Sequence, residues 1–387
     1  MANFYKPLNQ QNDIVNTKTL LHEAIPLTGT IVSGTYDDAN IKEYTHGMFT
    51  SVYDYPYLSS SANHIFDITV GISPKSGLSS SLAAHQAKKI NVYNQMAQVL
   101  MGYDQTGSVL QFDEDGDIIG GGTKLKEVFF VNFSRLLVKD EIKKGTFELE
   151  FGVNTTSSTQ FADKKELHIE RLKITDLSGS DSYNVNSPVG EYGILYVTGS
   201  SEYSYSGSLK ATEKSSILKD FAGNGESTPC GLLFYQAGVA VITGSIFLKE
   251  SSGGLLNNLH GDVEMKGPVG GRNEDVVSVL TGSLISGSSD NLRERLYNLQ
   301  FNNTTELNST VYFCRVNHNE FNYSSNPTYL SGSKIRVKTQ STDVPISYIT
   351  SIGLYSDSNE LLAVAKLSEP LKKSPDTEFT LRVRLDY

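Results

Sequence analysis

Carboxylates at a spacing that could bind calcium occur at residues 113–117, which read DEDGD. Calcium-binding loops place acidic side chains on alternate residues in this way, and they end with a further acidic residue at the twelfth position. Lys124 occupies that position here. A lysine repels a divalent cation, so the segment predicts the solvated turn of a hairpin rather than a calcium site. Residues 354–363 (LYSDSNELLA) share the layout of residues 110–119 (LQFDEDGDII) and predict a second hairpin of the same kind.

No other pattern in the sequence matches a catalytic or cofactor site. The glycines at 120–122 precede Lys124 without the spacing of a phosphate-binding loop. The seven histidines, His318 among them, show no metal-ligand spacing, and no Gly-x-Ser-x-Gly motif occurs. Glu148 and Glu150 alternate with apolar residues, as solvated side chains of a strand do. We therefore expect no enzyme activity, no cofactor, and no catalytic or metal-binding residue, although carboxylates that only folding brings together leave no motif.

The segment EFNYSSNPTY, residues 320–329, predicts an ordered loop rather than a helix or a strand. Its Asn and Ser side chains can bond to the backbone in place of a strand partner, and Pro327 restricts the residue before it. We expect this loop to present Phe321, Tyr323 and Tyr329 to a neighbouring subunit. Packing of the loop against its own domain is the alternative.

A second tyrosine-rich segment, YDYPY at residues 53–57, predicts another turn that presents aromatic side chains. Because Tyr is common at protein interfaces, we expect Tyr55 and Tyr57 to contact a neighbouring subunit as well. In a receptor-binding protein these tyrosines, together with those of EYSYSG at residues 202–207, would instead stack on sugar rings.

Composition and charge exclude several classes of function. The formal charge of −10 over 387 residues repels phosphate backbones, so we expect no nucleic-acid partner. No window approaches the ~20 apolar residues of a membrane span, and the N-terminal residues lack the pattern of a signal peptide. We therefore expect synthesis in a reducing cytoplasm, with Cys230 and Cys314 as buried free thiols. A disulfide between them is the alternative.

The periodicity of apolar residues indicates the elements that position these segments. Helical spacing predicts one longer helix at about 80–101, packed against a sheet, and one short helix at about 289–300. Most other segments alternate apolar and polar residues, most clearly at residues 379–386. The chain has 21 Tyr and 17 Phe, which favour strands. The sequence therefore predicts a mainly β protein built from antiparallel, β-sandwich-like domains.

Breaks in composition predict the domain organisation. Ser/Gly/Asn-rich stretches near residues 178–190 and Gly-rich residues near 260–275 are typical of boundaries. We expect four parts: an extended N-terminal arm at 1–27, a β-rich domain with the longer helix at 28–178, a middle β domain at 179–270 and a C-terminal β domain at 271–387. The arm either pairs within its own domain or reaches onto a neighbouring subunit.

Two long segments carry a resemblance to known proteins. The C-terminal third contains GLYSDSNELLAVAKLSEPLKK and the closing strand TEFTLRVRL. These features resemble the C-terminal ends of baseplate wedge and tail-fibre-attachment proteins of contractile-tailed bacteriophages. Residues 28–71, TGTIVSGTYDDANIKEYTHGMFTSVYDYPYLSSSANHIFDITVG, are similar to uncharacterised structural proteins of large marine myoviruses. The resemblance covers about half of the chain and brings no catalytic residues with it.

The resemblance implies a structural protein of a phage virion. It implies a place in the viral tail, at the baseplate, where the protein would hold neighbouring subunits together. Its partners would be other phage structural proteins and further copies of itself, repeated by the symmetry of the tail. A tail receptor or carbohydrate-binding protein, a head or neck structural protein and a glycan-degrading tail hydrolase are the alternatives, although no β-helix repeat supports the hydrolase.

Overall fold

The computed structural model divides the chain into two compact units. The central unit comprises His22–Thr305, and the terminal unit joins Met1–Leu21 to Glu306–Tyr387. The structure describes residues 5–22, 38–80, 84–116, 122–137, 140–153, 171–200, 228–257, 262–263, 265–266, 272–282, 284–324, 326–332, 334–336 and 340–386.

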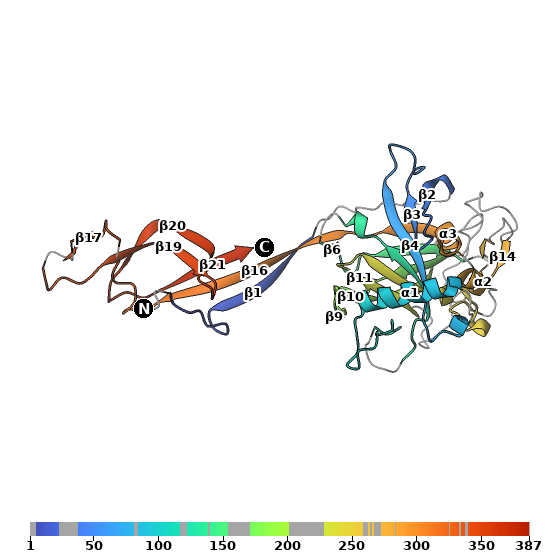
Figure 1. Cartoon of the computed structure of the whole chain (residues 1–387), viewed down its shortest axis with the longest axis horizontal. Helices are drawn as coiled ribbons and strands as arrows, with labels where there is room; N and C mark the ends of the chain where they lie inside the picture. Colours follow the sequence, from blue (N-terminus) through green and yellow to red (C-terminus); the bar gives the residue numbers. More distant parts are fainter. Residues whose placement is uncertain are drawn as a thin grey trace. The chain divides into compact units, whose positions relative to one another are not determined.

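The protein is mainly β with antiparallel sheets, as the sequence predicts. The central unit contains one large sheet (Figure 1). In sheet order its strands are β15 (Leu296–Gln300), β7 (Glu148–Gly152), β8 (Arg171–Thr175), β10 (Gly190–Ser200), β11 (Thr228–Phe234), β12 (Val239–Thr243), β5 (Glu127–Asn132), β4 (His64–Ile72), β3 (Thr50–Tyr53) and β2 (Ile41–Glu43), with β9 (Asn184–Ser187) beside β10. Short strands β13 (Met265–Lys266) and β14 (Arg272–Glu274) pair separately.

Two of the expected domain boundaries, 178/179 and 270/271, fall inside the central unit. Strands β8 and β10 lie on either side of the first boundary and pair directly with each other. The Ser/Gly/Asn-rich segment between them is therefore a connection within one sheet. Beyond the second boundary, Val276 and Leu280 of helix α2 (Val276–Thr281) belong to the same core as the sheet. The expected boundary at 27/28 lies outside the described residues.

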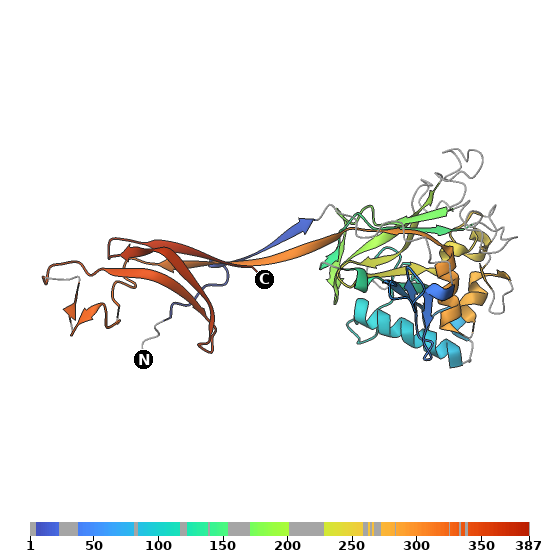
Figure 2. The same ribbon diagram turned by 90° about the horizontal axis from the view of Figure 1, so that it is seen from above.

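The longer helix forms where the sequence predicts it, as α1 (Ala84–Leu100). It packs against β4 (Figures 1 and 2). Tyr93, Ala97 and Leu100 are buried on one face, and the Tyr93 hydroxyl donates a hydrogen bond to the carbonyl of Leu125 at 2.7 Å. Among the described residues, none of the helices has the length and apolar character that crossing a membrane requires.

The short helix differs from its prediction. Helix α3 spans Ile285–Arg295, and the next five residues form strand β15 instead of continuing the helix. Leu296 and Leu299 are buried there because β15 pairs with β7. Ser289, at the expected start of the helix, lies inside it, where its hydroxyl donates to the carbonyl of Ile285 at 2.9 Å. The short helix is therefore present, but it begins four residues and ends five residues before the expected range of about 289–300.

The core of the central unit is rich in phenylalanine. Phe66, Phe133, Phe147 and Phe301 form a connected group with ring centroids 5.6–6.2 Å apart. Offset and edge-on ring contacts of this kind add to the stabilisation from apolar burial.

Glu150 lies in β7 and is only 7% exposed, so the expectation that it is a solvated side chain was wrong.

The terminal unit contains a small sheet and a hairpin. The sheet has the order β1 (Ile14–His22), β16 (Asn303–Val316) and β21 (Phe379–Asp386). The hairpin of β19 (Ser347–Tyr355) and β20 (Leu361–Lys373) lies next to this sheet in both views (Figures 1 and 2). Strand β16 begins in the central unit, where its first residues pair with β6 (Glu141–Ile142). Strands β17 (Leu330–Ser331) and β18 (Lys334–Ile335) form a further short pair.

The N-terminal segment pairs within its own chain. Strand β1 lies beside β16, and the Phe313 amide donates to the carbonyl of Asp13 at 2.8 Å. The carboxylate of Asp13 also forms an ion pair with Arg315 at 2.8 Å. In this structure the expected arm is therefore a strand of the terminal unit.

Two local predictions for the terminal unit are confirmed. Along β21, Phe379, Leu381, Val383 and Leu385 are buried or half-buried, and every residue between them is exposed. The turn of the β19–β20 hairpin falls at residues 356–359, as the polar sequence predicts.

Candidate functional site

The first and twelfth residues of the calcium-loop pattern, Asp113 and Lys124, form an ion pair. Asp113 and Lys124 form an antiparallel bridge, as a hairpin requires, and the Lys124 ammonium contacts the Asp113 carboxylate. The side chain of Asp113 is fully buried, whereas Asp115 is exposed, as expected of a solvated turn; residues 117–121 lie outside the described residues. In the described part of the chain, no group of three or more His, Cys, Asp or Glu side chains could hold a metal ion.

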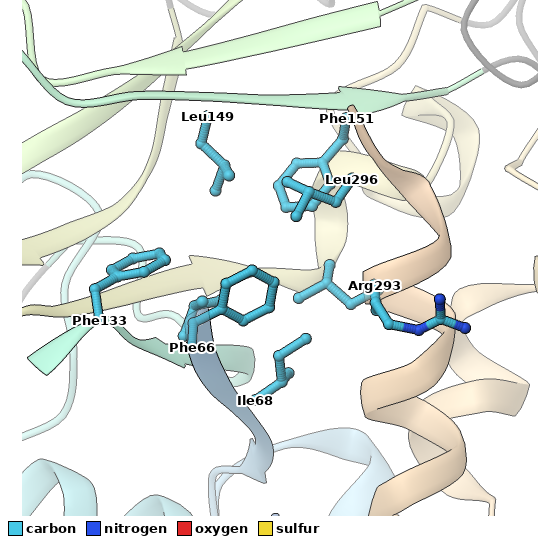
Figure 3. A pocket seen from close by; sticks show the side chains of 9 residues that line it. Phe66, Ile68, Phe133, Leu149, Phe151, Arg293 and Leu296 are labelled. Carbon is cyan, nitrogen blue, oxygen red and sulfur yellow. The ribbon is translucent and has the colours of Figure 1, made fainter. Parts of the chain in front are cut away.

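A small apolar cavity in the central unit lies between the sheet and α3 (Figure 3). Its volume is about 10 Å³, which is roughly the space that one water molecule needs. Phe66, Phe151 and Leu296 are among the side chains that line it. The guanidinium of Arg293 points away from them and pairs with Asp290 at 2.7 Å (Figure 3). The cavity is too small for a substrate.

One buried lysine donates hydrogen bonds to the loop of residues 317–329, which we call the aromatic loop. The side chain of Lys373 is fully buried, and its ammonium donates to the His318 carbonyl at 2.9 Å and to the Asn322 side chain at 2.7 Å. The Ser347 hydroxyl donates to the carbonyl of Phe321. These bonds join the loop to β19 and β20, so the loop is ordered, as its sequence predicts.

The N-terminal segment contacts the same loop. The Lys6 ammonium lies 2.5 Å from the Glu320 carboxylate. This hydrogen bond, together with a bond from the Asn317 amide, holds the pKa of Glu320 below its usual value. The contact is partly exposed, so its contribution to stability is small.

The three aromatic side chains expected at a subunit contact differ in their exposure. Phe321 is 47% exposed and Tyr323 is 57% exposed, whereas Tyr329 is half-buried. The Tyr323 and Tyr329 rings meet edge-on with centroids 6.2 Å apart. Phe321 has a φ of 55°, a left-handed conformation that a bulky residue rarely adopts.

The β19–β20 hairpin exposes a second group of apolar side chains. Tyr355 pairs with Leu361, and Gly353 pairs with Val364. The register shifts between these two pairs, but the side chains of Tyr355 and Leu361 lie over Gly353, so the four residues share one face of the hairpin. The ring of Tyr5 lies 4.6 Å from that of Tyr355 and extends the group. All four of these side chains are at least 43% exposed. We call Tyr5, Gly353, Tyr355, Leu361 and Val364 the hairpin patch.

The terminal unit buries few apolar side chains of its own. Among its described residues, four are buried: Val311, Val316, Leu354 and Val383. Ten large ones are exposed: Tyr5, Val15, Phe321, Tyr323, Val344, Tyr348, Tyr355, Leu361, Leu362 and Val364. The central unit has the opposite balance of buried and exposed apolar side chains, with about fifty buried among its described residues. A surface of this kind is typical of proteins that bury it against a partner.

In the central unit, Tyr55 and Tyr57 lie in a braced loop between β3 and β4. The Asp54 carboxylate accepts hydrogen bonds from the Asn63 amide at 2.6 Å and from the Asn63 side chain at 2.8 Å. Tyr55 is 56% exposed and Tyr57 is 38% exposed, and Leu58 beside them is 85% exposed. The loop thus presents a rigid apolar tip. The tyrosines of residues 202–207 lie outside the described residues.

A buried polar cluster links β6, β8 and β11. The Lys144 ammonium pairs with Glu191 at 2.6 Å and with Glu141 at 3.2 Å, and it lies over the ring of Tyr235. The Asp176 carboxylate accepts the Gly145 amide at 2.7 Å, and burial raises its pKa. Burial and the neighbouring Asp176 also raise the pKa of Tyr235. The ion pairs of Lys144 and the hydrogen bond accepted by Asp176 join neighbouring segments of the sheet, so the cluster is best explained as a brace for the sheet.

A second buried cation joins two helices. The Lys89 side chain of α1 is fully buried, and its ammonium donates to the carbonyls of Leu280 and Gly282 at the end of α2. Gln86 donates to the Thr281 carbonyl at 3.0 Å beside it. Burial lowers the pKa of Lys89 to about 8. The lysine satisfies helix carbonyls that would otherwise lack donors.

The cysteines and the histidine singled out in the sequence have ordinary surroundings. Both cysteines are free; Cys230 is buried, whereas Cys314 is only half-buried. Burial raises the pKa of both thiols, which makes them poor nucleophiles. His318 is exposed and lies 3.2 Å from the Glu378 carboxylate.

The hairpin patch is the feature that sequence reasoning missed. The run LLAVA at residues 361–365 has no alternation, and such a run usually predicts burial on both faces. The lack of alternation was the available signal, but only the structure shows that part of the run is exposed.

The chain matches no protein-family model, no curated protein and no solved structure.

Proposed function

We propose that the chain is a structural component of a bacteriophage virion, in which the terminal unit attaches it to neighbouring subunits of the tail, at the baseplate. The observation that carries the structural role is the reversed balance of the terminal unit, with four large apolar side chains buried and ten exposed among its described residues. The virion and the baseplate rest on the resemblance of the sequence to phage tail proteins.

The free energy of burying apolar side chains favours a state in which the terminal unit is bound to neighbouring subunits. Each large apolar side chain that leaves water contributes about 1.5–3 kcal/mol. A unit that buries so few of them gains less from folding alone than a domain of its size usually does. Burial of its exposed faces against neighbouring subunits supplies the missing contribution.

The aromatic loop adds specificity to such an attachment. Phe321 and Tyr323 stand on a loop that Lys373 and Ser347 hold in one conformation. Ordering a side chain at an interface costs roughly 0.5–1.5 kcal/mol, and a loop that is ordered beforehand avoids part of that cost. This arrangement suits a fixed structural contact.

Electron microscopy of particles labelled with gold-tagged antibody tests the proposed function. We expect gold at the distal end of the tail, on intact particles or on opened ones if neighbours cover the epitope. Gold at the head or neck would keep the structural role and overturn the baseplate position. Absence of gold from intact, opened and denatured particles would overturn the virion role.

A tail carbohydrate-binding protein is the second candidate. It is favoured by the loop of Tyr55 and Tyr57, which is braced by Asp54 and Asn63 and exposes both tyrosines. Rigid exposed aromatic rings are suitable platforms for sugar rings. Binding of the wild-type chain to a glycan array, lost in the Tyr55→Ala and Tyr57→Ala variants, would support this candidate.

A further inference from the structure

The hairpin patch is continuous. A Cβ atom built on Gly353 would lie 2.9 Å from the ring of Tyr355 and 3.3 Å from Leu361, so these two side chains close over the glycine. Val364 is the cross-strand partner of the same glycine, and Tyr5 meets the Tyr355 ring. The patch therefore presents aromatic and aliphatic groups together, as the cores of protein interfaces do.

The hairpin patch faces away from the core of its own unit. Leu354, which lies between Gly353 and Tyr355 in β19, points to the opposite face and is 9% exposed. Val364 is 53% exposed and Leu361 is 52% exposed. The hairpin thus uses one face for the unit's own packing and leaves the other uncovered.

The net charges of the two units differ, and this difference indicates which unit of the chain another copy can approach. In sequence, residues 22–305 carry 22 Lys and Arg against 33 Asp and Glu, a net charge of −11. The terminal unit carries 11 against 10, a net charge of +1. Two central units repel each other, whereas two terminal units meet with almost no net repulsion. The near-neutral unit also offers no strong field that would select an acidic or a basic partner.

We infer that the hairpin patch binds the hairpin patch of a second copy of this chain, across a two-fold axis. An isologous contact places the same residues on both sides, so aromatic and aliphatic groups meet groups of the same kind. Face-to-face packing of two hairpins buries the patch at the sheet spacing of about 10 Å. This inference rests on the proposed structural role, for which it names the partner.

Sedimentation equilibrium of the purified full chain tests the inference. We expect a monomer–dimer equilibrium for the wild type. The Leu361→Lys and Val364→Lys variants should each raise the dissociation constant more than about tenfold, because each buries an unpaired charge in the contact. Val99→Lys, at a 57% exposed position of helix α1 in the central unit, is the matched control and should leave the dissociation constant unchanged.

Three results would overturn the inference. A wild-type chain that stays monomeric up to about 1 mM would show that the patch does not bind a second copy. A dimer that Leu361→Lys and Val364→Lys leave intact would place the contact elsewhere. Dissociation by Val99→Lys to the same extent would implicate the central unit.

Sedimentation equilibrium and the gold labelling of particles together separate this inference from the proposed function. A dimer that depends on the patch, in a chain that labels no particle, would keep the inference and overturn the virion role. A monomeric chain that labels the tail would keep the virion role and overturn the inference.

Discussion

The ammonium of Lys373 lies 2.9 Å from the carbonyl oxygen of His318, and the lysine side chain is fully buried. It also donates to Asn322 at 2.7 Å. One residue at the end of β20 therefore bonds to two residues of the aromatic loop. The loop's order depends on a contact between residues 55 positions apart in the sequence.

Replacement of this lysine should loosen the loop. We expect Lys373→Met to lower the free energy of unfolding by at least about 2 kcal/mol, because even one bond to a charged group contributes about 1.5–3 kcal/mol and the variant keeps the apolar packing. Chemical denaturation measures the loss, and limited proteolysis should cut faster at residues 318–324. Lys372→Met, an exposed neighbour, is the control and should change stability by less than about 0.5 kcal/mol. Equal effects of the two variants would contradict the role of Lys373.

The left-handed backbone of Phe321 gives a second prediction. At a φ of 55° a glycine meets no steric penalty, whereas an alanine does. We expect Phe321→Gly to be more stable than Phe321→Ala by about 1 kcal/mol, the reverse of the order in extended or helical backbone. Thermal denaturation of the two variants compares them directly. A more stable alanine variant would show that the backbone is not left-handed there.

The aromatic loop should matter more for assembly than for folding. We expect Tyr323→Ala to fold with stability within about 0.5 kcal/mol of the wild type, because the side chain is exposed, but to reduce the yield and heat resistance of assembled particles. Tyr103→Ala, at a similarly exposed position of the central unit, serves as the control. Unchanged yield for Tyr323→Ala would remove this loop from the proposed contact.

The buried Lys89 predicts an unusual dependence of stability on pH. Its pKa is about 8 in the folded chain and near 10.4 when unfolded. Between these values the unfolded chain binds more protons, so stability rises with pH. We expect the wild type to gain about 1–3 kcal/mol between pH 7.5 and pH 10 relative to Lys89→Met, since each unit of pKa shift corresponds to about 1.4 kcal/mol.

Urea denaturation of both proteins at the two pH values measures this difference. Comparison with the variant cancels the titration of tyrosines and of other lysines. Curves that stay parallel from pH 7.5 to pH 10 would contradict the lowered pKa of Lys89.

Local sequence patterns predicted the elements that depend on neighbours along the chain. Alternation identified β21, the polar run at 356–359 identified a hairpin turn, and helical spacing identified α1. Leu292, Leu296 and Leu299 also fit one helix face, yet the last two lie on a strand because β7 offers them a distant partner. Local spacing carries no information about that partner.

The candidate site was predictable only in part. The exposed tyrosines stand out because their segments contain turn residues. The hairpin patch could not be read from the sequence, because an apolar run looks the same whether its own chain or another one covers it. The bonds of Lys373 to the loop join residues that are far apart in sequence, and no local pattern indicates such contacts.

Hydroxyl-radical footprinting of the free chain and of assembled particles tests most directly whether neighbours cover the terminal unit. Tyr323 and Tyr355 are exposed in the isolated chain, so both should be oxidised readily there and several-fold more slowly in particles. Tyr103 of the central unit provides the comparison within the same sample and should change less. Equal oxidation of Tyr323 and Tyr355 in the free chain and in particles would show that the terminal unit remains uncovered, and that it does not attach the chain to its neighbours.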